Sequence, residues 1–270
     1  MRFVRLGEPG RERDAVLIDD QYAAWLSPGD GDLRSRAAAA SGRVALADHR
    51  IGAPLRPGKI VCVGLNYADH AAEGGQQAPE EPILFMKAPD TVVGPYDDVV
   101  IPMGGEKTDW EVELGIVIGS QATNVSSAAA AAAHIAGYVL CNDVSERHFQ
   151  AERGGQWDKG KNCATFCPLG PWFVTADEIA DPQDIALGLE VNAKPYQKST
   201  TAQMIFSATY LVWYVSRFMT LYPGDVISSG TPAGVGAGQS PPVFLRPGDV
   251  MRAWASGLGE QRSRLVSVSS

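Results

Sequence analysis

The chain has 270 residues, of which 45% are hydrophobic and 20% charged, and its formal net charge is −8. This composition is typical of a globular protein with one large domain, alone or with a small one. The acidic balance argues against nucleic acid or an anionic membrane as a partner, although a local cluster of cations can still hold a small anion. No apolar run is long enough for a transmembrane helix, and the start of the chain lacks a signal-peptide core. We therefore expect a cytoplasmic protein whose four cysteines are reduced.

Residues 1–55 are predicted to form a small N-terminal domain. The stretches RFVRL and AVLI have the character of short strands around the turn GEPGRERD, a hairpin pattern, and SRAAAAS is predicted to form a short helix. The stretch GAPLRPGKI is rich in Pro and Gly, which is typical of a linker. We therefore place a second, larger domain at residues 56–270.

The larger domain is predicted to contain more strands than helices. Short apolar runs with strand character are separated by Gly, Pro, Asn and Asp: KIVCVGLNY, PILFMKA, VELGIVIG, GYVLCNDV, ALGLEVNAK and GDVISSG. Two helices are expected, one from an N-cap at Ser126 or Ser127 to Gly137, and one from about Ala202 to Leu221. Because strands and helices do not alternate regularly, we predict an α+β, mostly β fold.

The stretch TDWEVELGIVIG carries two glutamates, Glu111 and Glu113, in an otherwise apolar strand. Residues two apart in a strand point to the same face, so both carboxylates share one face. The opposite face is entirely apolar: Trp110, Val112, Leu114, Ile116 and Ile118. Like charges this close are unfavourable unless a cation lies between them. The alternative is that both are solvated residues on an edge strand.

A third carboxylate, Asp143, lies at the polar end of the strand that precedes it, in GYVLCNDV. Three carboxylates that offer only oxygen suit a hard divalent cation, most readily Mg²⁺, with Mn²⁺ or Ca²⁺ as alternatives. Mg²⁺ usually keeps several waters, which leaves positions open for a chelating substrate. An Asn-Asp pair is also common in turns, so the sequence alone leaves both readings open.

Seven motifs, in order, closely resemble the fumarylacetoacetate hydrolase family over about residues 59–270: KIVCVGLNYADHAAE, PILFMKAPDTVVGP, DWEVELGIVIG, GYVLCNDVSERHFQ, GKNCATFCPLGPW, MIFSATYLVWYVS and GDVISSGTPAGVG. The resemblance implies a mixed β-sheet roll, with residues 56–270 as the catalytic domain. It also implies that Glu111, Glu113 and Asp143 bind a divalent metal, usually Mg²⁺. Members of the family are commonly homodimers, so a homodimer or higher homo-oligomer is expected.

Within NYADHAAE, His70 and Glu73 are three residues apart and would share one face of a short helix. A carboxylate there can orient the imidazole, which can take a proton from water. The alternative for His70 is a capping or core histidine. The resemblance implies that this pair is catalytic, as in family hydrolases that cleave acylpyruvates, and that Lys161 is the active-site lysine. An ammonium group at that position would stabilise developing negative charge.

Four more residues are expected to contact the substrate. The resemblance places Arg147 and Gln150 near it, and a guanidinium suits bidentate capture of a carboxylate. Thr231, in SGTPAGVG, supplies a hydroxyl among glycines. Lys87, at the end of LFMK, is either a substrate contact or a lysine that reaches out to water.

The resemblance implies a metal-dependent hydrolase that cleaves a C–C bond of a 2,4-dioxo acid. The run from Glu146 to Trp172 is similar to members that act on 2,4-diketo-3-deoxy-L-rhamnonate or L-fuconate and release pyruvate and a hydroxy acid. Gln156 and Trp157 could then form a lid that binds hydroxyls. Ala164 departs from the commoner family form, which has an acidic residue there. Alternatives are an acylpyruvate or fumarylpyruvate hydrolase, a 2-oxo-acid decarboxylase or isomerase, and a non-catalytic sugar-acid-binding protein.

Other kinds of site are disfavoured. No G-x-S-x-G elbow is present, and GVGAG lacks the third glycine and the following helix of a dinucleotide loop. A zinc site of Cys141, Cys163, Cys167 and His148 lacks the usual spacing. His49 and His134 are expected to be structural.

Overall fold

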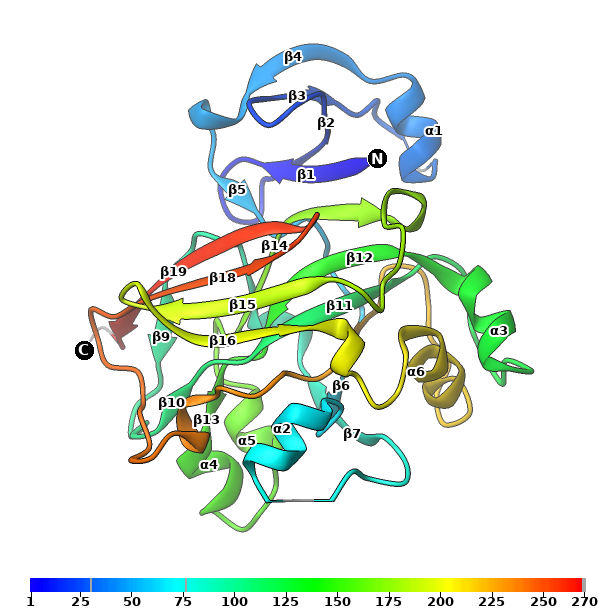
Figure 1. Ribbon diagram of the computed structural model, residues 1–270. Helices are drawn as coiled ribbons and strands as arrows, with labels where there is room; N and C mark the ends of the chain where they lie inside the picture. Colours follow the sequence, from blue (N-terminus) through cyan, green and yellow to red (C-terminus); the bar gives the residue numbers. More distant parts are fainter. Residues whose placement is uncertain (30, 76, 269–270) are drawn as a thin grey trace.

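The computed structural model describes residues 1–29, 31–75 and 77–268, and two large β-sheets dominate it (Figure 1). The larger, 12-stranded sheet has the order β4-β3-β2-β1-β14-β12-β11-β17-β6-β7, with β5 paired to β1 and β8 to β14. Its strands are β1 Arg2–Leu6, β2 Arg13–Leu17, β3 Tyr22–Trp25, β4 Ser41–Ala45, β5 Ile51–Gly52, β6 Ile60–Gly64, β7 Ile83–Lys87, β8 Val92–Val93, β11 Val112–Ile118, β12 Ile135–Asn142, β14 Cys167–Thr175 and β17 Val226–Ser228.

The second sheet has five strands in the order β16-β15-β18-β19-β9, and β10 and β13 form a separate pair. Its strands are β9 Val99–Ile101, β15 Ala186–Val191, β16 Lys194–Thr200, β18 Val250–Ala255 and β19 Gly259–Ser267, and the short pair is β10 Thr108–Asp109 and β13 Ser145–Glu146. Most neighbours are antiparallel, but β6 with β17, β8 with β14 and β9 with β19 are parallel pairs. The sheets are therefore mixed, and the predicted mostly β fold is confirmed.

The main core lies between the two sheets. Leu114 and Leu140 of the larger sheet and Leu189 and Ala253 of the second sheet belong to one buried apolar cluster. Every residue of β11 is buried, because β12 and β17 flank this strand in the larger sheet. The apolar face predicted for residues 110–118 is thus confirmed as a core face.

The described residues form six short α-helices: α1 Leu33–Ala38, α2 Ala68–Glu73, α3 Ala128–Ala131, α4 Arg147–Ala151, α5 Asp158–Lys161 and α6 Ala208–Val215. Helices α2, α4 and α5 gather at the end of the molecule opposite the N-terminal strands (Figure 1). No helix in the described part of the chain is long and apolar enough to cross a membrane.

The two long helices predicted from the sequence are both shorter in the structure. Ser127 caps α3 as expected, but the helix gives way to a 3-10 turn and β12 begins at Ile135. Gly137 therefore lies inside a strand, where a Cβ would come within 2.0 Å of the Val174 carbonyl oxygen. Its lack of a side chain serves close strand packing, not helix termination.

The second predicted helix is shortened at both ends to α6, Ala208–Val215, which Ser207 caps. At its start, the chain is held by a distant residue. This residue is Asn66, whose carbonyl oxygen accepts a hydrogen bond from Ile205 N at 2.7 Å. Its side-chain oxygen accepts another from Phe206 N, also at 2.7 Å. These bonds hold the chain extended before the helix, so tertiary contacts override the helical spacing.

Residues 1–52 form strands β1 to β5 and helix α1 at one end of the molecule (Figure 1). The predicted hairpin is confirmed by the antiparallel pairing of β1 with β2. β1 also pairs with β14, so the larger sheet continues across the boundary at residue 55. The division into two domains stays a prediction.

Candidate metal centre and active site

Glu111, Glu113 and Asp143 form a buried cluster, and the two glutamates line a pocket. Each offers a carboxylate oxygen within 4.8 Å of the others. Their exposed fractions are 6%, 2% and 0%. Glu113 lies in β11, an interior strand, and Glu111 directly precedes it, so the alternative of a solvated edge strand is wrong for the two glutamates. The pairing of β11 with β12 brings Asp143, which directly follows β12, to the two glutamates.

Cations balance two of the three carboxylates. Lys161 Nζ lies 2.8 Å from Glu111 Oε2 and 2.7 Å from Asp143 Oδ2, and a guanidinium nitrogen of Arg147 lies 2.7 Å from Glu111 Oε1. Burial raises the pKa of Glu111, but the charges of Lys161 and Arg147 outweigh it and hold that pKa at about 2. Glu111 is therefore ionised in the absence of a metal.

Glu113 differs, because the described groups that bond it are uncharged. Ser228 Oγ donates to Glu113 Oε2 at 2.6 Å and Gly230 N donates to the same oxygen at 2.9 Å. Burial, with the charges of Asp143 and Glu111, raises the pKa of Glu113 well above its usual value. A buried carboxylate without a counter-charge is unfavourable. A cluster that offers only oxygen ligands and lacks a positive charge beside Glu113 fits a hard divalent cation.

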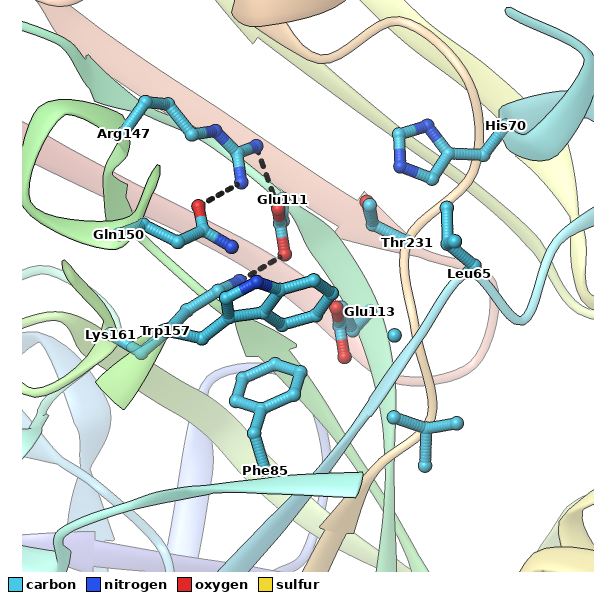
Figure 2. Close-up of a pocket in the computed structure, with 12 residues that line it drawn as sticks. Leu65, His70, Phe85, Glu111, Glu113, Arg147, Gln150, Trp157, Lys161 and Thr231 are labelled. Atoms are coloured by element: carbon cyan, nitrogen blue, oxygen red, sulfur yellow. Dashed lines mark hydrogen bonds and ion pairs between the residues drawn. The ribbon is translucent and has the colours of Figure 1, made fainter. Parts of the chain in front are cut away.

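Seven of the ten residues predicted for the site line one pocket: His70, Glu111, Glu113, Arg147, Gln150, Lys161 and Thr231. Figure 2 shows His70 across the pocket from Lys161, with Glu111 bonded to both Arg147 and Lys161. An apolar group completes the lining: Val63, Gly64, Leu65, Phe85 and Trp157. Asp143, Lys87 and Glu73 are not part of the lining.

The predicted His70–Glu73 pair forms on α2. Nδ1 of His70 lies 3.4 Å from Oε2 of Glu73. Gly234 N donates to both oxygens of Glu73, at 3.0 and 3.1 Å, and so fixes the carboxylate from the other side. With Glu73 at Nδ1, the Nε2 atom is the nitrogen left for a proton transfer. The reading of His70 as a core residue is wrong, since its side chain lines the pocket.

Lys87 lies beneath the carboxylates. It is 1% exposed, its Nζ lies 2.7 Å from Asp143 Oδ1, and it donates to the Val144 carbonyl at 3.0 Å and to the Lys161 carbonyl. The reading of Lys87 as a lysine that reaches water is therefore wrong. Its predicted substrate contact is not seen in the pocket lining, and it serves as a buried counter-charge to Asp143.

The sequence analysis missed one residue of the site and assigned others to it incorrectly. Asp109 is buried and bonds Arg147 at 2.9 Å. Trp157 lines the pocket, whereas Gln156 is exposed and bonds Asp158 instead. Asp109 lies two residues before Glu111, and this position in the sequence could have identified it as a candidate site residue. Ala164 is exposed and lies outside the pocket lining.

The other histidines and the cysteines lie elsewhere. His148 contacts Glu152 at 3.2 Å and His134 contacts Ser120 at 3.0 Å, while His49 packs against Trp25. The four cysteines are free. Within the described ranges, the carboxylate trio is the one group of acids, histidines or thiols with metal-ligand spacing.

This fold and pocket are those of a hydrolase- or isomerase-type enzyme with a carboxylate cluster suited to a divalent cation. The chain belongs to the fumarylacetoacetate hydrolase family, because the family model described as "Fumarylacetoacetate (FAA) hydrolase C-terminal" matches residues 59–266. The resemblance found in the motifs is thereby confirmed. Members of this family generally depend on a divalent metal.

Relatives agree in fold and differ in reaction. A Burkholderia multivorans protein named "Putative hydrolase" is 47% identical over 97% of both chains. The structure of 5-carboxymethyl-2-hydroxymuconate delta-isomerase from Mycobacterium smegmatis is 36% identical, covers 100% of both chains and has a TM-score of 0.83. A fumarylacetoacetate hydrolase from Exiguobacterium antarcticum is 34% identical over 99% of both chains, with a TM-score of 0.85. The family therefore establishes the enzyme type, and the choice of reaction depends on the pocket.

Proposed function

We propose that the protein hydrolyses the C–C bond of a 2,4-dioxo acid to give pyruvate and a second carboxylic acid. The observation that carries the proposal is the His70–Glu73 pair, whose His70 lines the same pocket as Glu111 and Glu113. Hydrolysis needs a base that activates water, and this pair can provide one. Arg147, at the same pocket, can hold the substrate carboxylate.

Glu111, Glu113 and Asp143 would hold the divalent cation, most suitably Mg²⁺. When bound, such a cation supplies Lewis-acid polarisation of a chelating 2-oxo acid. Lys161 is buried, and the charges of Asp143 and Glu111 outweigh its burial and raise its pKa, so it is a fixed positive charge at the pocket floor. That charge favours the build-up of an enolate nearby.

The proton steps follow from His70 and the substrate. Nε2 of His70 takes a proton from water, and the hydroxide adds to C4. The bond between C3 and C4 then breaks, its electron pair stays on C3 as pyruvate enolate, and C4 becomes the carboxyl carbon of the second product. The imidazolium returns its proton to C3, which balances the reaction. Glu73 stabilises the imidazolium between these steps.

A panel of substrates would show which substituent at C4 the enzyme accepts. The sequence resemblance favours 2,4-diketo-3-deoxy-L-rhamnonate or L-fuconate, and simple acylpyruvates and fumarylpyruvate are the alternatives. Pyruvate released from each compound is measured with Mg²⁺, with Mn²⁺ and after chelation, and the His70→Ala variant is the control. Turnover that survives exhaustive chelation, or that His70→Ala leaves intact, would contradict the proposal.

The same assay separates two other reactions. An isomerase would change the ultraviolet spectrum of a dienoate substrate and release no pyruvate, and a decarboxylase would release CO₂ from oxaloacetate. The M. smegmatis isomerase among the similar structures makes the first comparison worthwhile. We also propose that the enzyme works as a homodimer or a higher homo-oligomer, which light scattering during gel filtration would measure.

A further inference from the structure

Asp109, at the end of β10, is fully buried and joins three segments of the chain. Its Oδ1 accepts hydrogen bonds from Trp110 N at 2.8 Å and Gly236 N at 2.6 Å. Its Oδ2 accepts from Ala237 N at 3.0 Å and Arg147 Nε at 2.9 Å. One carboxylate thus connects the segment that leads into β11, the start of α4 and the glycine-rich loop 230–238.

The loop is closely attached to residues on both sides of the pocket. Gly230 N donates to Glu113, and Gly234 N donates to Glu73 at 3.0 Å. Gly236 has no room for a side chain, because a Cβ would lie 2.0 Å from the Val243 carbonyl oxygen and 2.7 Å from Asp109 Oδ1. The glycines therefore allow the backbone to approach carboxylates, and the loop that Asp109 anchors is the loop that fixes Glu73.

Asp109 also sets the direction of the Arg147 side chain. Because Nε bonds Asp109, the other two guanidinium nitrogens bond Glu111 Oε1 at 2.7 Å and Gln150 Oε1 at 3.0 Å. Without Asp109, the guanidinium would be free to pair with Glu111 through two nitrogens. Such pairing would turn it away from a substrate carboxylate in the pocket.

We propose that Asp109 is a positioning residue that holds two functional groups at once: Arg147 for the substrate carboxylate and loop 230–238 for the Glu73 side of the catalytic pair. Its effect on turnover rests on the proposed function. Its effect on the loop and on Arg147 does not, and can be measured without any substrate.

The test uses Asp109→Asn, which keeps the size of the side chain but replaces one accepting oxygen with a donor that faces N–H groups. Asp97→Asn is the matched control. Asp97 also accepts hydrogen bonds from an arginine Nε, that of Arg50 at 2.8 Å, and from a backbone N–H, that of Gly94 at 2.7 Å, but it lines a different surface hollow.

Hydrogen exchange gives the readout that is independent of activity. In Asp109→Asn, exchange of the amides of residues 234–238 is expected to rise about tenfold or more, while other protected segments stay as in the wild type. In Asp97→Asn, these amides should not change. A uniform rise over the whole chain would show general destabilisation and would contradict a positioning role.

Binding and kinetic measurements then separate the effect of Asp109 on Arg147 from its effect on Glu73. Asp109→Asn should weaken binding of pyruvate to the Mn²⁺-loaded protein by about tenfold, through Arg147, and should lower kcat by about tenfold to 100-fold, through Glu73. The affinity for Mn²⁺ itself should change less than about threefold. Asp97→Asn should change pyruvate binding, kcat and the affinity for Mn²⁺ by less than about twofold. If no 2,4-dioxo acid is turned over by the wild type, the proposed function fails, but the exchange and pyruvate-binding results still decide the role of Asp109.

A second variant covers the case in which Asp109→Asn does not fold. Ala237→Pro removes one N–H donor from Asp109 and leaves the Arg147 contact intact. Exchange of residues 234–236 should rise and kcat should fall, with pyruvate binding unchanged. Wild-type exchange and kinetics in whichever of the two variants folds would overturn the proposal.

Discussion

Lys161 and Asp143 are in direct contact, with Nζ of the buried lysine 2.7 Å from Oδ2 of the carboxylate. The same ammonium group lies 2.8 Å from Glu111, whereas a hydroxyl and a backbone N–H are the described donors to Glu113. The three carboxylates are therefore unequal before any metal binds. Two already have counter-charges, whereas Glu113 has none among the described groups, and a bound cation would supply it.

This inequality predicts that two similar substitutions weaken metal binding alike but differ in their effect on the stability of the metal-free protein. Glu113→Gln should raise the Kd for Mn²⁺ by about 100-fold or more, yet change the unfolding free energy of the metal-free protein by less than about 1 kcal/mol. Glu111→Gln should also lose the metal and should cost about 3 kcal/mol, because Lys161 and Arg147 lose a buried partner. Calorimetric titration and urea unfolding measure both quantities. Equal destabilisation by the two variants would contradict the assignment.

The sequence predicted the carboxylate cluster better than its surroundings. Glu111 and Glu113 followed from strand alternation, and the His70–Glu73 pair followed from helical spacing, because both patterns are local. The donors that distinguish Glu113 from Glu111 could not be predicted, since Gly230 is 117 residues away from Glu113 in the chain. Alternation shows which face a side chain occupies, but it does not show which distant segment covers that face.

Trp157 is predicted to limit the size of the substrate substituent. Its ring packs on Phe85 with centroids 5.5 Å apart, and it lies so close to Gly64 that a Cβ there would be 2.9 Å from the ring. Trp157→Ala should raise kcat/KM for an acylpyruvate with a bulky substituent relative to acetylpyruvate by about tenfold. Gln156→Ala is the control, because Gln156 is exposed. A loss of sugar-acid turnover in Gln156→Ala would instead support the lid expected from the sequence.

Gly238 is predicted to leave the space that the Glu73 carboxylate occupies. A Cβ at this position would lie 2.6 Å from Glu73 Cδ, and the flexible end of Glu73 is the part able to move. Gly238→Ala should therefore displace the carboxylate from His70 and lower kcat by about tenfold. KM should change little, because Arg147 and Gln150 are untouched. Steady-state kinetics would check this, and Gly31→Ala is the control, because the nearest atom to a Cβ there is Arg36 Cγ at 3.7 Å and the backbone is not left-handed.

Cys163 is predicted to react slowly with thiol reagents although it is only partly buried. Burial raises the pKa of Cys163 to about 11, so about one molecule in a thousand carries the thiolate at pH 8. The rate of reaction with Ellman's reagent should rise about tenfold per pH unit from pH 7 to 10, since the thiolate fraction grows with pH. Cys163→Ser should abolish this slow phase. A fast reaction at pH 7 would show that the thiol is activated and would reopen a role for it.

Removal of residues 1–52 is predicted to destabilise the rest of the chain. β1 pairs with β14, and the rings of Phe3 and Phe173 stack with centroids 5.9 Å apart. Truncation would leave the Phe173–Val174 part of β14 as an unpaired edge and expose Phe173, which is nearly fully buried in one apolar cluster with Phe3. Loss of this burial should cost about 3–6 kcal/mol and lower Tm by about 10 °C or more. Phe3→Ala in the full chain, measured by the same thermal unfolding, should reproduce part of that loss. An unchanged Tm in the truncated protein would show that residues 53–270 fold independently of the N-terminal strands.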